Sequence, residues 1–223
     1  MIKLVAFDWN GTLISDAQAC VEGVNQVLKY LKVQPTTLTR FRQVFDVPVS
    51  KSYLAHGVDK KTLATRSLEI AEVFHGYYEK RSIKVRTRQN TRKLLTYLKE
   101  NNIERIIFSN HTHVGITNQL KRLKLEHFFS KVIANSELDS ALKARGKKEK
   151  LEDYISSRKL KHRDVLIIGD TKEEVEIAKE LGTISIVITH GHSSTPRLRA
   201  TKPDYLISDL GQVINIVKKL NLL

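Results

Sequence analysis

The chain has little of what marks a secreted, disulfide-stabilised or membrane-spanning protein. It contains 1 cysteine, 4 prolines and 10 glycines in 223 residues. Cys20 cannot form an internal disulfide, and its place on the apolar side of a helical pattern predicts a buried core thiol. No apolar run approaches the roughly 18 residues of a membrane span, and the N-terminus lacks the regions of a signal peptide. The sequence therefore predicts a soluble, cytoplasmic protein with no membrane partner.

Charge of one sign is in excess. Lys and Arg number 38 against 24 Asp and Glu, which gives a formal net charge of +14 and a pI near 9.8. Such a surplus attracts phosphorylated metabolites, nucleotides and nucleic acid. The basic residues gather in patches at 80–93, 143–150, 158–163 and 196–202, but no zinc-knuckle spacing or aromatic nucleic-acid signature accompanies them. We interpret the patches as a solubilising surface, with nucleic acid as a less favoured partner.

Short apolar runs alternate with longer segments of helical period, a pattern typical of an α/β domain with a parallel sheet. The expected strands are 2–7, 103–108, 131–134, 164–169, 184–188 and 205–207. The expected helices are 16–32, with Ser15 or Asp16 as N-cap, 62–81, 90–101 and 171–182. The gap between the first two strands is too long for one crossover helix and shows only helical patterns. We therefore predict a Rossmann-like core of residues 1–14 and 86–223, with a small helical domain inserted at 15–85.

Polar residues stand where the predicted strands end. They are Asp8 and Asn10, Ser109 and Asn110, and Asp170 with Glu174 one helical turn further on. The carboxyl ends of parallel strands meet at one edge of a sheet, so these side chains are expected to lie together. A carboxylate there can attack phosphorus or hold Mg²⁺, and a backbone carbonyl two residues on can share the metal. With lysines at a helix start in 146–155, the set predicts a metal-assisted phosphoryl-transfer site.

The lysine of this site can be chosen by helical spacing. Lys147, Lys148 and Lys150 are close in sequence, and a run of charge is usually a solvated face. Lys147 stands four residues before Leu151, which puts it on the same helical side as a buried anchor. We favour Lys147, with Lys148 as the alternative.

The whole chain resembles haloacid dehalogenase superfamily hydrolases with a helical cap of the C1 type, and is similar to phosphoglycolate phosphatases. Four motifs carry the resemblance in the right order: FDWNGTL, IIFSN, a lysine near 147, and IIGDTKEEVEIAKELG. It implies a phosphatase with Asp8 as the nucleophile that forms an aspartyl-phosphate. It further implies that Ser109 and the Asn110 amide bind the phosphoryl group of a small substrate, and that Lys147 neutralises charge.

The resemblance also implies the metal ligands. Asp8, Asp170 and the main-chain carbonyl of Asn10 would hold Mg²⁺. Glu174 stands where the family often has Asp, and its side chain is one methylene longer. Direct ligation by Glu174 and a role limited to the helix dipole both stay open.

Asn10 departs from the family pattern. Related phosphatases carry there a carboxyl group that protonates the leaving alkoxide and then deprotonates the attacking water, and an amide can do neither. Because general acid-base catalysis contributes roughly 100- to 10,000-fold, we expect a slowed enzyme that prefers activated leaving groups. A non-catalytic phosphate- or nucleic-acid-binding relative is the alternative. Haloacid dehalogenase activity is less favoured, because the GDT motif and the acidic residues after it are kept.

Two His-x-His pairs follow strands. They are His111 with His113, and His190 with His192. We expect exposed loop histidines, although a histidine at this edge could replace the missing acid or recruit a transition metal. Within the insert, the cations that could meet a substrate anion are Arg42, Lys51 and His56, and the sequence does not rank them.

Overall fold

The structure is a computed structural model that describes residues 1–143 and 146–222. Its centre is a six-stranded parallel sheet in the order β3-β2-β1-β4-β5-β6. The strands are β1 (Leu4–Phe7), β2 (Glu104–Thr112), β3 (Lys131–Asn135), β4 (Val165–Gly169), β5 (Ile184–Ile188) and β6 (Tyr205–Ile207). The predicted α/β class with a parallel sheet is confirmed.

The predicted end of the second strand was wrong. β2 runs on to Thr112, and its pairing with β3 becomes irregular between Phe108 and Thr112. Ser109 and Asn110 therefore lie within the irregular end of β2 rather than after it. They still belong to the carboxyl edge of the sheet, where β1 and β4 also end.

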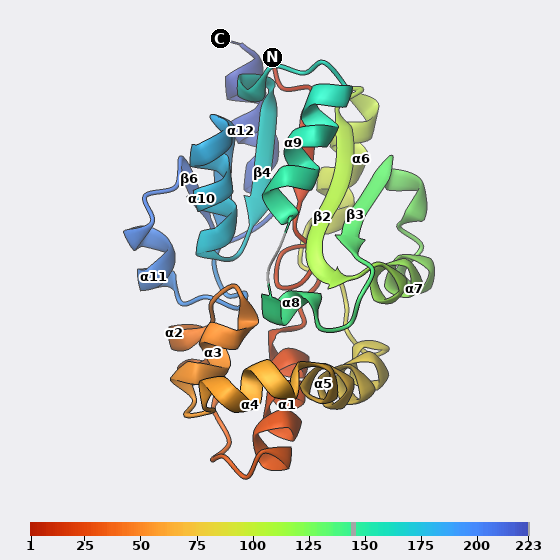
Figure 1. The fold of residues 1–223 in the computed structure, drawn as a ribbon. Coiled ribbons are helices and arrows are strands. Elements are labelled where there is room, and N and C mark those ends of the chain that lie inside the picture. The colour runs from red at the N-terminus through yellow and green to blue at the C-terminus, as the bar shows by residue number, and fades with distance from the viewer. Residues whose placement is uncertain (144–145, 223) are drawn as a thin grey trace.

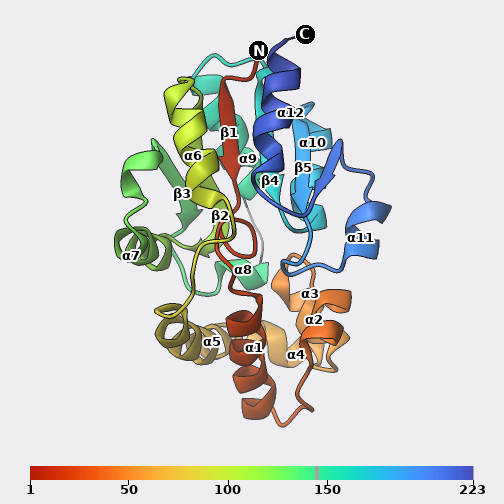
Figure 2. The ribbon, with the colours of Figure 1, turned by 180° about the vertical axis from the view of Figure 1, so that it is seen from behind.

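Helices cover both faces of the sheet (Figures 1 and 2). One face carries α9 (Lys147–Ser157) and α10 (Lys172–Leu181), and the other carries α6 (Thr91–Glu100) and α12 (Gln212–Asn221). Alternation along β1 explains this, because Leu4 and Ala6 join the core under α9 and α10 while Val5 and Phe7 join the opposite core. β1 is buried along its whole length, as its uninterrupted apolar run predicts.

Smaller elements connect these layers. They are α7 (His113–Leu123), α8 (Ser140–Lys143), α11 (Thr195–Ala200) and the short 3-10 helices Glu126–Phe128 and His162–Asp164. Among the described residues, none of the helices combines the length and apolar character needed to cross a bilayer.

Five helices between β1 and α6 form a layer of their own at the carboxyl edge of the sheet (Figure 1). They are α1 (Ala17–Tyr30), α2 (Leu38–Val44), α3 (Val49–Ala55), α4 (Lys60–Thr65) and α5 (Ser67–Ser82). We call them the helical layer. The single helix predicted at 62–81 was wrong, because the chain breaks at Arg66 into α4 and α5. The division of the chain at residues 15 and 85 stays a prediction.

Hydrogen bonds and an ion pair connect the helical layer to residues next to the carboxyl edge of the sheet. Arg42 of α2 donates from Nε to the carbonyl of Gly191 at 2.9 Å and from Nη2 to the carbonyl of His190 at 2.8 Å. Lys172 Nζ, at the start of α10, lies 3.0 Å from Asp46 Oδ2. These contacts hold the layer over the ends of β4 and β5.

Candidate active site

Asp8 and Asp170 meet where β1 and β4 end. The amide of Asp8 donates to the carbonyl of Ile168 at 2.8 Å, which continues the pairing of the two strands. Thr12 Oγ1 donates to Asp170 Oδ1 at 3.1 Å and lies 3.5 Å from Asp8 Oδ2. Gly11 has φ +72°, and a Cβ there would lie 2.2 Å from Asp170 Oδ2. The turn after β1 therefore needs glycine both for its backbone and for its approach to Asp170.

Both carboxyl groups are buried and electrostatically crowded. Burial raises the pKa of Asp8 to about 8, with Glu174 and Asp170 adding to the rise and Lys147 opposing it. Burial likewise raises the pKa of Asp170, which His192 lowers and Glu174 raises further. A cation beside them would favour the ionised forms. Carboxylate oxygens in this setting suit a hard divalent ion such as Mg²⁺.

Lys147 lies inside this group of carboxylates. Its Nζ contacts Asp8 Oδ1 at 3.4 Å, Glu173 Oε2 at 3.0 Å and Glu174 Oε1. Burial would lower the pKa of Lys147, but the three carboxylates hold it well above its usual value. Lys148 instead reaches outward to Glu180 at 2.8 Å. Of the two lysines considered from the sequence, Lys147 is the one at the site.

Glu174 is engaged through both of its oxygens. Oε2 accepts from the Thr171 amide at 3.1 Å and from Thr171 Oγ1 at 2.6 Å, which completes a capping box at the start of α10. Oε1 contacts Lys147. A glycine precedes Asp170 because a Cβ on Gly169 would lie 2.1 Å from Glu174 Cγ. The contacts are those of a capping residue paired with Lys147, and its ligation of a metal stays a prediction.

Ser109 and Asn110 line the same cavity as Asp8 and Lys147. Ser109 is buried, and its Oγ accepts from the His111 amide at 3.3 Å. Asn110 Nδ2 donates to Glu173 Oε2 at 2.7 Å. Through Glu173, the side chain of Asn110 is thus linked to Lys147, a connection that the sequence alone did not indicate.

The side chain of Asn10 lines the cavity beside Asp8 and bonds to Asp16 and to Tyr78 of the helical layer. Its Nδ2 lies 2.7 Å from Asp16 Oδ2 and 2.7 Å from the Tyr78 hydroxyl. Tyr78 also donates to Asp16 Oδ2 at 2.7 Å, and the Gly11 amide donates to Asp16 Oδ1 at 2.6 Å. Of the two residues considered as N-cap, Asp16 does occupy the N-cap position of α1, but its side chain makes no cap hydrogen bond to the helix and binds this turn instead.

Asp16 is held as a carboxylate by a buried histidine. Burial would raise the pKa of Asp16, but His192 and the bonds from Asn10 and Tyr78 lower it to about 2. His192 Nε2 lies 3.4 Å from Asp16 Oδ1, and His192 Nδ1 lies 3.6 Å from Asp170 Oδ2. Burial would lower the pKa of His192, but Asp170 and Asp16 raise it to about 9. The His192 imidazole therefore lies between the two carboxyl groups, within ion-pair distance of both.

The expectation of exposed loop histidines was half wrong. His111 and His192 are buried and line the cavity, whereas His113 and His190 are exposed. In a chain segment with alternating side chains, the first and third residues share a face, but the helix start at His113 breaks that alternation. The His-x-His spacing was visible in the sequence, but which histidine of each pair is buried depends on the tertiary fold.

The cavity lies between the carboxyl edge of the sheet and the helical layer. Its volume is about 130 Å³, and its wall in the helical layer is largely apolar and aromatic, including Phe41, Phe45, Tyr53, Ile70 and Phe74. Of the cations proposed for the substrate, only His56 lines it. Arg42 binds core carbonyls, and Lys51 contacts the Val47 carbonyl at 3.4 Å. The described arrangement can hold an anionic group beside Asp8 and an apolar group above it.

Known proteins are similar to this chain in sequence. A family model described as haloacid dehalogenase-like hydrolase matches residues 5–188. Phosphoglycolate phosphatase from Haemophilus influenzae is 22% identical over 224 residues, which cover 96% of this chain and 98% of that protein.

Solved structures agree in fold. A haloacid dehalogenase-like family hydrolase from Streptococcus pneumoniae superposes with a TM-score of 0.80 at 22% identity, covering 97% of this chain and 98% of the other. A structure described as a predicted phosphatase from Clostridium acetobutylicum gives a TM-score of 0.83 at 20% identity, covering 98% and 99%. The sheet and the helical layer together have counterparts in these proteins.

Proposed function

We propose, since this chain belongs to the haloacid dehalogenase-like hydrolase family, that it is a phosphatase acting on a small phosphorylated substrate through Asp8. The observation that carries the proposal is the contact of Lys147 Nζ with Asp8 Oδ1 at 3.4 Å in a buried site. A protein that only binds phosphate gains nothing from a buried carboxylate, which repels the ligand. A nucleophile held beside an ammonium group suits phosphoryl transfer.

Asp8, Asp170 and the main-chain carbonyl of Asn10 are proposed to hold Mg²⁺. The raised pKa values of the two buried carboxyl groups support this, because their ionised forms need a compensating cation. When bound, the ion supplies positive charge to the phosphoryl oxygens and keeps Asp8 ionised. Because Glu174 contacts Lys147 through Oε1 and Thr171 through Oε2, we propose it chiefly as the residue that positions Lys147, with direct ligation of the metal as the less favoured role.

The protein groups perform the rest of the reaction. A carboxylate oxygen of Asp8 attacks phosphorus, the bond to the leaving oxygen breaks, and an aspartyl-phosphate forms. Ser109 and the Asn110 amide are proposed to bind the phosphoryl oxygens, and Lys147 to balance their charge. The leaving oxygen takes up a proton from solvent. Water then attacks phosphorus and loses a proton to solvent, which releases phosphate and restores the carboxylate of Asp8. The helical layer, proposed as a cap at residues 15–85, shields these steps from bulk water.

Asn10 sets the expected substrate preference. Its amide cannot protonate a leaving alkoxide, so esters with poor leaving groups should react slowly. Acyl and aryl phosphates need little protonation and should react faster. The apolar wall of the cavity also suits a substrate whose organic part is apolar.

The test is a phosphatase assay with Mg²⁺ on acetyl phosphate, p-nitrophenyl phosphate, phosphoglycolate and a simple alkyl phosphate. We include phosphoglycolate because the Haemophilus influenzae relative is named for it. Wild type should release phosphate from the first two, and the Asp8→Asn variant should not. Equal rates in both proteins would refute Asp8 as the nucleophile. Inactivity on every substrate, together with salt-sensitive RNA or DNA binding, would favour the binding-only alternative.

A further inference from the structure

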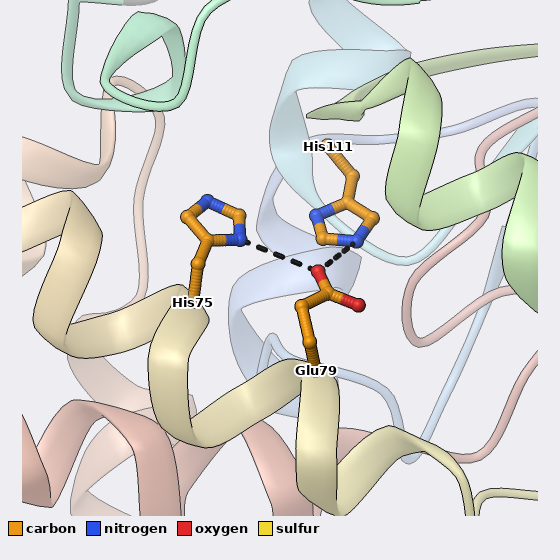
Figure 3. A group of neighbouring side chains, drawn as sticks. All are labelled: His75, Glu79 and His111. Carbon is orange, nitrogen blue, oxygen red and sulfur yellow. Dashed lines mark hydrogen bonds and ion pairs between the residues drawn. The ribbon is translucent and has the colours of Figure 1, made fainter.

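We propose that His75, Glu79 and His111 bind a divalent transition-metal ion of the zinc type, which bridges helix α5 and strand β2 beside the cavity. Figure 3 shows the two imidazole rings and the carboxylate turned toward one another. Glu79 Oε1 lies 3.4 Å from His75 Nδ1 and 3.1 Å from His111 Nε2. A tetrahedral ion with bonds of about 2.1 Å separates its ligands by roughly 3.4 Å.

The three ligand atoms are already gathered without an ion. One atom from each residue lies within 4.8 Å of the other two. His75 and Glu79 are four residues apart in α5, so they project from the same side of the helix. His111 comes from β2, and its ring stacks on His75 with centroids 5.3 Å apart.

The His111 ring supplies a second, independent sign of a ligand. Its side chain is 6% exposed, and no described residue makes an aligned hydrogen bond to Nε2. The contact with Glu79 is close enough for an ion pair, but it lacks hydrogen-bond alignment. Buried polar atoms are nearly always hydrogen-bonded. His111 Nε2 is buried close to a carboxylate oxygen without hydrogen-bond geometry, and this needs a reason. A metal ion between the two groups would supply one.

Gly115 keeps space for this group from a third element, α7. A Cβ at Gly115 would lie 2.5 Å from His111 Nε2 and 2.9 Å from Glu79 Oε1. Glycine inside a helix costs about 1 kcal/mol relative to alanine, so its presence here trades helix stability for room. The space left by the absent side chain of Gly115 lies next to the proposed ligand atoms.

The charge of the group also suits a cation. A glutamate carboxyl is ordinarily ionised at neutral pH, so Glu79 supplies a negative charge beside the two imidazoles. Two imidazoles and one carboxylate favour zinc-type ions, whereas the oxygen set around Asp8 favours Mg²⁺. The two sites therefore differ in chemistry, and this one does not depend on the proposed phosphatase reaction.

The ion would have a position left for an outside ligand. Three protein ligands leave a fourth coordination position in a zinc site of this composition. Both His75 and His111 line the cavity that Asp8 and Ser109 also line. An anionic group of a substrate could occupy that position, and the ion would meanwhile tie the helical layer to the sheet.

The experiment titrates metal-stripped protein with Co²⁺ and Zn²⁺ while saturating Mg²⁺ occupies oxygen sites. Wild type should bind one ion per chain, with Co²⁺ developing visible absorption typical of coordination by nitrogen. His75→Gln and Glu79→Gln should each weaken binding at least about tenfold. His113→Gln, at an exposed histidine two residues from His111, should bind as wild type does. Unchanged affinity in both α5 variants would overturn the proposal.

Two further measurements keep the test of the metal site independent of other failures. The first does not depend on whether a variant folds, and the second does not depend on whether the protein is a phosphatase. Zinc X-ray absorption on wild type should show two imidazoles in the shell, and fewer than two would overturn the site without any variant. Asp8→Asn should lose phosphatase activity and still bind Co²⁺ with wild-type affinity. An inactive wild-type protein that binds Co²⁺ in this way would refute the phosphatase and leave the metal site standing.

Discussion

Asn10 Nδ2 lies 2.7 Å from Asp16 Oδ2, so the amide in the signature motif is matched to a carboxylate six residues further on. Asp16 is ionised, because its pKa lies at about 2. A carboxylate at position 10 would face this charge at hydrogen-bond distance. The amide at 10 and the carboxylate at 16 therefore form a pair, and replacing Asn10 alone by Asp places like charges together.

Replacing Asn10 by Asp should consequently restore less activity than the motif suggests. The new carboxyl group would share a proton with Asp16, and folding stability should fall. The double variant Asn10→Asp with Asp16→Asn exchanges the two groups and should raise kcat on an alkyl phosphate by roughly 100-fold or more. Rates on p-nitrophenyl phosphate should change much less. Steady-state kinetics on both substrates decides the matter, and a double variant no faster than wild type would mean that the missing acid does not limit the rate.

Lys147 and Lys148 offer a matched comparison. Lys147→Met removes the ammonium from Asp8, Glu173 and Glu174 and should lower kcat/KM by roughly 100-fold or more. Lys148→Met removes only an exposed ion pair with Glu180 and should leave the kinetics unchanged. Circular dichroism checks that both variants fold. A fully active Lys147→Met protein would remove this lysine from the mechanism.

His192 should make stability depend on pH above neutrality. Its pKa is raised from 6.5 to about 9, because Asp170 and Asp16 outweigh the effect of burial. A raised pKa stabilises the fold fully below pH 6.5, and that stability is lost as the pH rises through about 9. Thermal unfolding in EDTA should show this decline in wild type and a flatter profile in His192→Asn. Added Mg²⁺ should weaken the effect, since a cation at Asp170 competes with the imidazolium. An equally steep decline in the variant would assign it to other groups.

The sheet and its polar edge were predictable because their signals are local. Uninterrupted apolar runs mark strands buried on both faces, and the residue after each run falls at the carboxyl edge. The spacing of Lys147 from Leu151 likewise picked the lysine that contacts Asp8. These inferences need only the periodicity of side chains along a helix or strand and the common direction of the strands in a parallel sheet.

Contacts between elements were not predictable in the same way. Asp16 reads as a helix cap, and only the fold shows that its side chain turns back to Gly11 and Tyr78. His75 and His111 are neighbours because α5 crosses the end of β2, which no local pattern encodes. The sequence offered two separate clues: His111 follows a strand where a histidine could recruit a transition metal, and His75 and Glu79 stand four apart, so they can share a ligand in a helix.

Two glycines provide the last prediction, because they differ in what surrounds them. Gly76 lies in α5 with open space around it, so Gly76→Ala should stabilise the protein by about 0.5 to 1 kcal/mol through helix propensity. Gly115→Ala should instead destabilise it by about 1 to 3 kcal/mol, because the methyl group would press on His111 Nε2, and an imidazole ring in a packed site cannot yield easily. Urea unfolding measures both. If Gly115→Ala were as stable as wild type, the His111 ring would have room to move, and its position beside Glu79 would not be fixed by packing against α7.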